Sequence, residues 1–273
     1  MSNKLQDLYG TADQVRSAFA GDEQRAARYF DDYLKFVTRS APPIQDGTVL
    51  DIGCGAGWST FLFAKQGNMA TGIDLNEKAF EPPLIAGLKL LRASILEMPF
   101  EDESFDIVTT YQTIEHVPDT RRALLEMLRV CKPGGTVCIV GPNLVSLGQS
   151  LKVLRFPLRN RPLSRVFVRR DGMPRHPYGN TLPETLVSIP LTLGRIVAKT
   201  LKPGARFTMR QPDLTPPFYA DNDACYLCNP IDLVKFLSKN GCCIIQNGAY
   251  GRPRWTASLA GGTWIAARKQ VAG

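Results

Sequence analysis

The chain has 273 residues, 44% of them hydrophobic, and a formal net charge of +8. This length allows one full hydrophobic core with an added elaboration. No apolar run approaches the roughly 20 residues of a membrane span, which excludes an integral membrane protein. Seven cysteines without disulfide-framework spacing favour a reducing compartment, and the first residues lack an apolar signal core. We therefore expect a cytoplasmic location.

The positive charge is concentrated in one segment. From Ser150 to Arg210 there are 13 Lys and Arg residues and two acidic residues, a balance of +11. The rest of the chain carries 20 basic and 23 acidic residues, a balance of −3. Such a segment could contact anionic lipid, phosphate or nucleic acid.

The first half of the chain predicts alternating strands and helices. Residues 12–39 carry an apolar stripe at helical spacing, and Pro42 and Pro43 end it. The strands predicted next cover residues 48–52, 70–75, 88–93, 105–110 and 136–140. Helices are expected over 60–66 and 119–130, the second with Asp119 as N-cap, and Lys132 to Gly135 reads as a turn. This alternation predicts a doubly wound, mainly parallel α/β sheet.

Regularity is expected to lapse between Pro142 and about Asn229, where prolines recur. Asn229 and Pro230 then open a predicted helix over 231–239, followed by strands over 242–246 and 263–267, which makes seven strands. Because the middle region is too long for an ordinary connection, we interpret it as a basic helical or irregular cap inserted after the fifth strand. The expected divisions are a lid helix over 1–45, a core over 46–141, the cap over 142–228, and the end of the core over 229–273.

The stretch TVLDIGCGAGWST, residues 48–60, is the most informative motif. Asp51 ends a buried strand, and Gly53, Gly55 and Gly57 then alternate with other residues. Glycines let a ligand approach the backbone closely. Asp74 ends the next strand, where its carboxylate could accept bonds from both hydroxyls of a ribose. An NAD-binding turn is the alternative, although dinucleotide sites use the different spacing GxGxxG/A.

With Asp74, this motif resembles the class I S-adenosylmethionine-dependent methyltransferases. The resemblance implies that Asp51 contacts the ammonium group of the cofactor and that Asp74 binds its ribose. The loop residues implied to line the same ligand are Gly53, Cys54, Gly55, Gly57 and Leu75.

The run RASILEMPFEDESFDIV, residues 92–108, resembles the D-A-x-x-L-P-F-x-D-x-S-F-D-x-V segment of the type-11 methyltransferases. The family's adenine-binding aspartate corresponds to Ser94, whose hydroxyl makes a weaker bond than a carboxylate. Ile95 would be an apolar neighbour of the adenine.

The run YQTIEHVPD, residues 111–119, follows the fourth strand and resembles the ubiquinone-pathway O-methyltransferases. Tyr111 and Gln112 are expected to border the methionine part of the cofactor, because strand carboxyl ends face the ligand crevice. Some relatives carry E-x-x-E-H, which can bind a divalent metal. Gln112 replaces the first of those acids with a weaker, neutral ligand, so we expect no metal.

Glu115, His116 and His176 are the candidate catalytic residues. His116 could accept a proton from a substrate hydroxyl, or it could simply cap the neighbouring helix. His176, in the cap, could reach over the pocket or remain a solvated loop residue. Cys225 and Cys228, together with the pair at 242 and 243, suggest zinc. Adjacent cysteines on a strand point to opposite faces, however, which favours small packing residues.

The sequence therefore predicts transfer of a methyl group from S-adenosylmethionine to a small-molecule acceptor or one linked to a lipid or glycan, at oxygen. Residues 151–170 interleave apolar and basic side chains, so peripheral contact with the inner face of a membrane is also expected. An RNA methyltransferase that uses the basic segment is an alternative. The segment has few stacking aromatics and no recognised RNA-binding module, which argues against nucleic acid. A non-catalytic protein that binds the cofactor is a third reading.

Overall fold

The computed structural model describes residues 19, 21–41, 47–148, 150–151, 181–212, 223–248 and 261–271. Within these residues the helices are α2 (Glu23–Ser40), α3 (Trp58–Lys65), α4 (Thr120–Val130), α7 (Leu182–Leu201) and α8 (Pro230–Lys239). The strands are β1 (Thr48–Ile52), β2 (Met69–Asp74), β3 (Leu88–Arg92), β4 (Phe105–Tyr111), β5 (Cys131–Pro142), β6 (Cys242–Asn247) and β7 (Gly262–Lys269). Short 3₁₀ turns cover Glu77–Ala79 and Ile114–His116.

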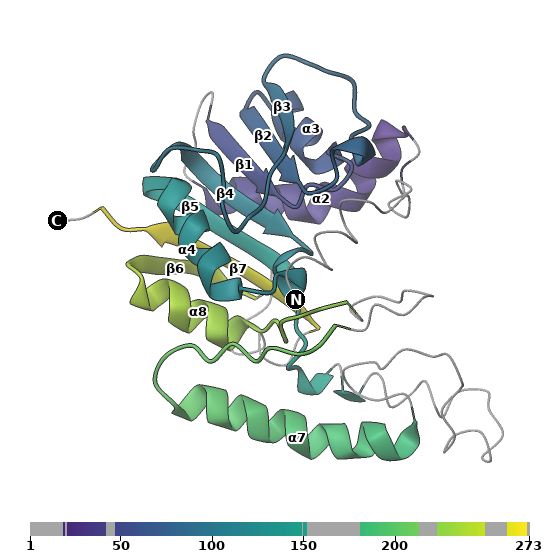
Figure 1. Ribbon diagram of the computed structural model, residues 1–273, viewed down its shortest axis with the longest axis vertical. Coiled ribbons are helices and arrows are strands. Elements are labelled where there is room, and N and C mark those ends of the chain that lie inside the picture. Colours follow the sequence, from purple (N-terminus) through teal and green to yellow (C-terminus); the bar gives the residue numbers. More distant parts are fainter. Residues whose placement is uncertain are drawn as a thin grey trace.

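The seven strands form one sheet in the order β3-β2-β1-β4-β5-β7-β6 (Figure 1). The first five strands pair in parallel, and β7 runs antiparallel to both β5 and β6. This arrangement confirms the predicted doubly wound, mainly parallel sheet. The strand order reverses between β1 and β4, and in such sheets ligands bind beyond the carboxyl ends of the strands at that reversal.

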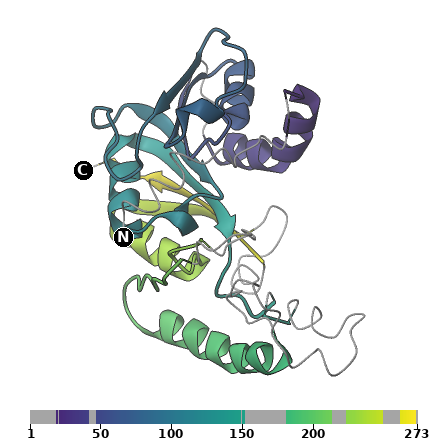
Figure 2. The same ribbon diagram turned by 45° about the vertical axis from the view of Figure 1, so that its right-hand side comes forward.

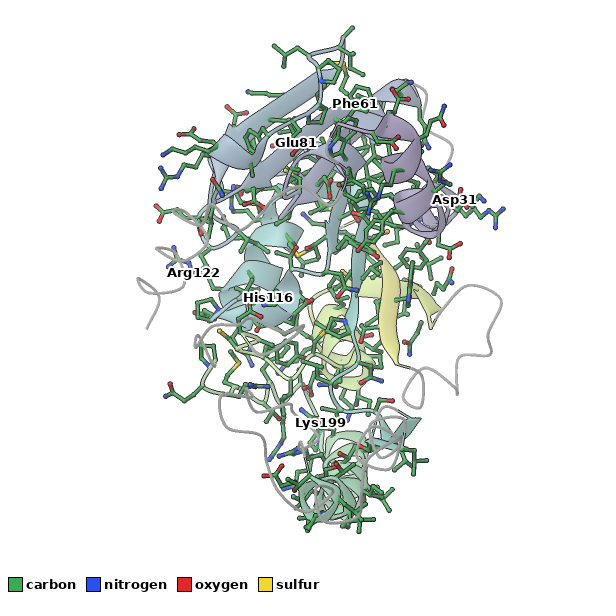
Figure 3. All side chains as sticks on the ribbon, turned by 90° about the vertical axis from the view of Figure 1, so that its right-hand side faces the viewer. Asp31, Phe61, Glu81, His116, Arg122 and Lys199 are labelled. Atoms are coloured by element: carbon green, nitrogen blue, oxygen red, sulfur yellow. The ribbon has the colours of Figure 1, made fainter. Side chains whose placement is uncertain are left out.

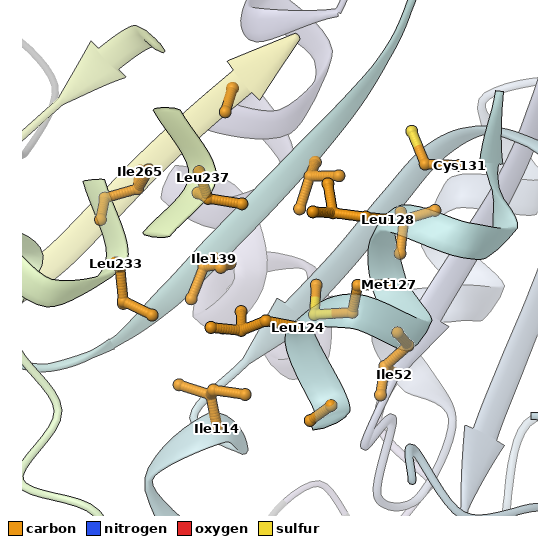
Figure 4. Close-up of a cluster of buried hydrophobic side chains, with 14 of the residues drawn as sticks. Ile52, Ile114, Leu124, Met127, Leu128, Cys131, Ile139, Leu233, Leu237 and Ile265 are labelled. Atoms are coloured by element: carbon orange, nitrogen blue, oxygen red, sulfur yellow. The ribbon is translucent and has the colours of Figure 1, made fainter. Parts of the chain in front are cut away.

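Helices cover both faces of the sheet, because successive residues of each buried strand point to opposite sides. Val49 packs with α2 and α3 on one face, whereas the next residue, Leu50, packs with α4 and α8 on the other. Figure 4 shows the second cluster, in which Ile139 and Ile265 of the sheet meet Leu124 of α4 and Leu233 of α8. These layers fix the strand ends that carry the site.

Local capping signals account for where three of the helices begin. The side chain of Asp22 accepts a hydrogen bond from the backbone of Arg25 at the start of α2. Asp119 caps α4 as predicted. Asn229 caps α8, with Pro230 as the first helical residue, which is also as predicted. The predicted helix over 12–39 begins at residue 23 in the described part of the chain, and its residues 12–18 lie outside that part.

Strand β5 is longer than predicted. It begins at Cys131 and includes the residues predicted as a turn, 132–135. Cys131 pairs with Phe105 and Thr136 with Ile107, so the register shifts across this stretch. Gly134 has a φ of +78° there. The chain therefore makes a local bend, as its glycines suggested, but the bend lies inside strand β5 and does not precede it.

Helix α7 is a 20-residue element in the region where the sequence predicts only short segments (Figures 1 and 2). Its first turn is fixed by a capping box, in which Thr181 and Glu184 each bond the other's backbone N–H. Pro183 lies in that first turn, where a missing N–H costs nothing. Pro190 lies inside the helix, so it predicts a break that the structure does not make. No helix within the described ranges is long and apolar enough to cross a membrane.

Candidate functional site

A cavity of about 350 Å³ opens beyond the carboxyl ends of β1, β2 and β4, at the point where the strand order reverses. Its walls come from three stretches that follow these strands, from the residues after β3, and from Asp223. The lining residues are Ile52, Gly53, Gly55, Ile73, Asp74, Leu75, Asn76, Ala79, Ala93, Ser94, Ile95, Leu96, Gln112, Thr113, His116, Val117, Pro118 and Asp223. The cavity therefore brings together eight of the residues singled out from the sequence.

The glycine loop forms one wall with its bare backbone. Gly53 has a φ of +68°, and its N–H donates to the carbonyl of Ile73 at 2.8 Å. A Cβ added at Gly53 would lie 2.3 Å from the Thr113 Oγ1 atom. Because both the backbone angle and the contact exclude a side chain, only glycine fits at this point of the wall.

Asp74 lies at the end of β2 and joins the loop to the cavity. Its Oδ2 accepts from the N–H of Gly55 at 2.9 Å, and its Oδ1 accepts from the N–H of Asn76 at 3.0 Å. Burial raises the pKa of Asp74, while the backbone N–H groups of Asn76 and Gly55 act in the opposite direction. The carboxylate is thus held in one orientation beside the cavity.

Asp51 lies behind the cavity, where its side chain is fully enclosed. The residue is 1% exposed, and its carboxylate accepts bonds from Ser59 at 2.6 Å, Thr60 at 2.9 Å and Tyr33 of α2 at 3.1 Å. Burial raises the pKa of Asp51, and the hydroxyls of Ser59, Thr60 and Tyr33 act in the opposite direction. The position indicates that Asp51 fixes the loop from behind, so its predicted contact with a cofactor ammonium group stays a prediction.

Three other residues predicted to touch the cofactor also stand outside the cavity wall. Cys54 is buried, and burial raises the pKa of its thiol well above the usual value. Gly57 begins α3 with a φ of +91°, and a Cβ there would meet Leu90 at 2.7 Å. The ring of Tyr111 packs against those of Tyr33 and Phe30, on the side of β4 away from the cavity lining.

The residues after β3 and β4 lie in the wall as the sequence suggested. Ser94 and Ile95 line it together, and the Ser94 hydroxyl accepts from the N–H of Leu96 at 3.2 Å. Gln112 lines it with a φ of +51°, one of two non-glycine residues with positive φ in the described part of the chain. Strained backbone of this kind gathers at ligand sites.

His116 lines the cavity and is labelled in Figure 3. Its side chain is 22% exposed. The Nδ1 atom lies 3.3 Å from Asp223 Oδ2, and the Nε2 atom lies 3.7 Å from Glu115 Oε1. Glu115 is fully buried, and its carbonyl accepts from the N–H groups of Cys225 and Tyr226 at 2.8 and 2.9 Å. An imidazole flanked by two carboxylates is well placed to exchange protons.

Asp223 is a residue of the cavity wall, next to His116, that the sequence analysis did not single out. It lies 107 positions after His116 in a segment without a recognisable motif, so spacing carries no signal for it. The paired backbone bonds from Cys225 and Tyr226 to Glu115 hold this segment against the turn that carries His116. His176 lies outside the described residues.

The cysteines behave as packing residues. Cys242 is buried and Cys243 is exposed, as expected for neighbours on a strand. Cys225 and Cys228 are buried free thiols. Across the residues placed in the structure, no group of His, Cys, Asp and Glu side chains could hold a metal ion.

Comparison with known proteins assigns a family to the segment that carries most of this site. Residues 50–139 match the family model described as a methyltransferase domain. This segment is a methyltransferase domain. The match spans β1 to β5 and so includes the glycine loop, Asp74 and His116.

Named relatives agree with this assignment. Norajmaline N-methyltransferase of Rauvolfia serpentina is 33% identical over 149 residues, which are 50% of this chain and 51% of that protein. The chloroplastic tocopherol O-methyltransferase of Arabidopsis thaliana is 32% identical over 144 residues, 49% of this chain and 41% of that protein. The chain thus spans about half the length of these curated relatives. Their names include both N- and O-methyltransferases.

The fold is shared with solved structures. An S-adenosylmethionine-dependent methyltransferase from Mesorhizobium loti superimposes with a TM-score of 0.54 at 16% identity, covering 87% of this chain and 97% of that one. The residues of the cavity agree with S-adenosylmethionine as the ligand of this methyltransferase domain. Bare glycine backbone, a fixed carboxylate at the end of β2 and the Ser94–Ile95 wall provide the surfaces that such a ligand needs.

Proposed function

We propose that the protein transfers a methyl group from S-adenosylmethionine to the oxygen of a small-molecule or lipid-linked acceptor. One observation carries the proposal. The bare backbone at Gly53, the carboxylate of Asp74 and the imidazole of His116 line the same cavity beyond the carboxyl ends of β1, β2 and β4. The proposed cofactor site and the proposed proton acceptor, His116, therefore line one cavity.

Residues of the cavity divide into those that hold the cofactor and those that face the acceptor. Gly53 and Gly55 would admit the amino-acid end of the cofactor, Asp74 its ribose, and Ser94 with Ile95 its adenine. When bound, S-adenosylmethionine supplies an electrophilic methyl group on a sulfonium. Holding the acceptor beside that group converts a bimolecular reaction into an oriented one, which supplies most of the acceleration.

His116 would accept the proton of an acceptor hydroxyl as its oxygen becomes methylated. A hydroxyl is a weak nucleophile until a base takes its proton, and general-base catalysis contributes roughly 10²- to 10⁴-fold. Asp223, 3.3 Å from Nδ1, would fix the imidazole ring, and the apolar residues Val117 and Pro118 beside it would keep water out. Glu115 supports the same turn from its buried position.

One of the named relatives and the charge of the chain support the proposed class of acceptor. The tocopherol relative bears the name of an O-methyltransferase, which supports oxygen, and the basic balance of +11 between Ser150 and Arg210 favours an acceptor presented at an anionic surface. We accordingly propose a cytoplasmic enzyme with peripheral contact to the inner face of a membrane through its basic segment.

The test is a transfer assay with labelled S-adenosylmethionine and paired acceptors that differ in one atom. A phenol, the matching aniline, a prenylated form of each, and total RNA are incubated with the purified protein. Label is expected in the phenols, with more in the prenylated form. The His116→Gln variant should lose roughly 10²-fold or more in kcat while it still binds the cofactor. An Arg122→Gln variant on the exposed side of α4 should match the wild-type rate.

Three results would count against the proposal. Label in the anilines alone, unaffected by His116→Gln, would contradict oxygen methylation. Label in RNA alone would contradict a small-molecule acceptor. Cofactor binding without transfer to any acceptor would indicate a binding protein instead of an enzyme.

A further inference from the structure

Helix α7 buries polar side chains and exposes apolar ones. Thr185, Ser188, Thr192 and Lys199 face the rest of the chain, each no more than 9% exposed. On the other side stand six apolar side chains that are 46 to 78% exposed: Leu186, Val187, Leu191, Leu193, Val197 and Leu201. At about 100° of rotation per residue, the buried set spans roughly 60° of the helix circumference and the apolar set roughly 160° on the opposite side. This inverts the usual arrangement of a surface helix.

Specific polar contacts fix the helix in this orientation. The ammonium group of Lys199 pairs with the buried carboxylate of Asp232 and also donates to the carbonyl of Arg206 (Figure 3). The hydroxyl of Ser150 lies 3.2 Å from that of Thr192, midway along the helix. Turning the leucines inward would leave a buried charge without its partner, which costs several kcal/mol. The apolar side must therefore face outward.

The end of α7 is fastened as well. Lys235 of α8 donates to the carbonyls of Thr200 and Lys202 and to that of Lys199, which are the last acceptors of α7. These bonds satisfy carbonyls that a helix end leaves open. The helix is thus held beside α8 (Figure 2). Its apolar side chains remain exposed.

The charge around this apolar side indicates its occupant. Apart from the buried Lys199, residues 181–212 carry four basic residues and one acidic residue, Glu184. Arg195 and Lys202 are exposed and, by helical geometry, border the apolar side. Apolar side chains flanked by Lys and Arg match a bilayer that bears anionic headgroups, because the chains enter the acyl boundary while the cations remain at the surface.

We propose that the apolar side of α7 binds an anionic lipid bilayer, with the helix axis parallel to the membrane surface. This inference adds a docking surface to the proposed function, since it would hold the protein at the membrane that contains a lipid-linked acceptor. The observations that support the docking surface concern α7 and are independent of those that support the cofactor site.

The test is co-sedimentation of the full chain with phosphatidylcholine vesicles, with and without phosphatidylglycerol. The first variant combines Leu186→Gln, Leu193→Gln and Val197→Gln, which removes apolar surface without changing the charge or lowering the helix propensity. A control variant removes three exposed apolar side chains elsewhere, as Leu84→Gln, Leu125→Gln and Val271→Gln. Wild type and control are expected to bind the anionic vesicles, less tightly at high salt, and the α7 variant at least about tenfold less tightly.

Each alternative outcome is decisive. Absence of vesicle binding by the wild type, or equal binding by the α7 variant, would overturn the proposal. A wild-type dimer that the α7 variant turns into a monomer, again without vesicle binding, would instead assign this side to a second copy of the chain. S-adenosylmethionine titration of the same samples is independent of lipid, so failure of the docking surface and failure of the methyltransferase proposal are distinguishable.

Discussion

The carboxylate of Asp74 accepts a hydrogen bond from the backbone N–H of Gly55 at 2.9 Å. This single bond joins the end of β2 to the glycine loop that follows β1, two segments 19 residues apart in the sequence. The same side chain faces the cavity. The shape of the loop and the chemistry of the cavity wall therefore depend on one residue, and loop substitutions should alter cofactor binding more than overall stability.

Replacement of Gly53 by alanine is expected to weaken S-adenosylmethionine binding by at least about tenfold. The new Cβ would lie 2.3 Å from Thr113 Oγ1, in addition to the cost of a φ of +68°. Gly67→Ala is the matched control, because Gly67 has a φ of +89° and open space around its Cβ position. Calorimetric titration of both variants separates the two effects, and equal cofactor affinity in both would contradict the assigned wall.

Asp223→Asn is expected to reduce kcat by about tenfold or more while the KM for S-adenosylmethionine stays unchanged. The carboxylate lies 3.3 Å from Nδ1 of His116, so its loss should disturb the orientation of the imidazole without touching the cofactor wall. Asp223→Glu should restore part of the rate, since it keeps the charge. A fall in cofactor affinity that matches the fall in rate would assign Asp223 a structural role instead.

Lys199→Met should destabilise the protein by about 3–5 kcal/mol, because it leaves the carboxylate of Asp232, which is 1% exposed, without its cation. The double variant Lys199→Met with Asp232→Asn should recover much of that loss. Denaturant unfolding of the two variants, with exposed Lys239→Met as control, checks this expectation. A loss below about 1 kcal/mol in the single variant would show that the pair does not anchor α7.

Glu126 supplies a pH-dependent contribution to stability. Its carboxylate accepts two bonds from Arg129 and one from the N–H of Met98, and the contact with Arg129 holds the pKa of Glu126 below its usual range. The contribution is therefore present above the unfolded-state pKa and is lost as the pH falls through the lower folded-state pKa. Glu126→Gln should cost about 1 kcal/mol at neutral pH and nothing once the carboxyl is protonated.

Urea unfolding at neutral and at strongly acidic pH measures this difference. Exposed Glu97→Gln serves as the control, because it removes a carboxylate without a comparable set of donors. A cost for Glu126→Gln that persists unchanged into acid would show that packing, and not charge, accounts for it.

Local signals allowed much of the core to be predicted. Asp119 and Asn229 mark helix starts, because each side chain accepts a hydrogen bond from a backbone N–H three positions later, and Pro230 follows Asn229 as the first helical residue. The local sequence is therefore enough to predict these helix starts. The alternation of strands and helices likewise specified the doubly wound sheet. The predicted cap was expected to be helical or irregular, but the length and position of helix α7 within it were not predicted. Pro190 suggests a break, and the apolar side of the helix faces outward, which removes the usual link between pattern and burial.

The site was predictable only where chain neighbours form it. Gly53, Asp74 and Ser94 follow consecutive strands, and parallel strands bring their carboxyl ends to one edge. Asp51 carries a family motif, yet its enclosure depends on Tyr33 from α2, a residue 18 positions earlier that no spacing connects to it. Asp223 likewise reaches His116 only through the return of the chain after α7.

The central claim is that this cavity binds S-adenosylmethionine, and calorimetric titration tests it most directly. Purified protein is titrated with S-adenosylmethionine, with its demethylated product and with NAD, and the series is repeated with Asp74→Ala. Binding of the two sulfur ligands, absent for NAD and weakened by about tenfold or more in the variant, is the predicted result. Absence of binding for both sulfur ligands, or equal binding by wild type and Asp74→Ala, would contradict the account.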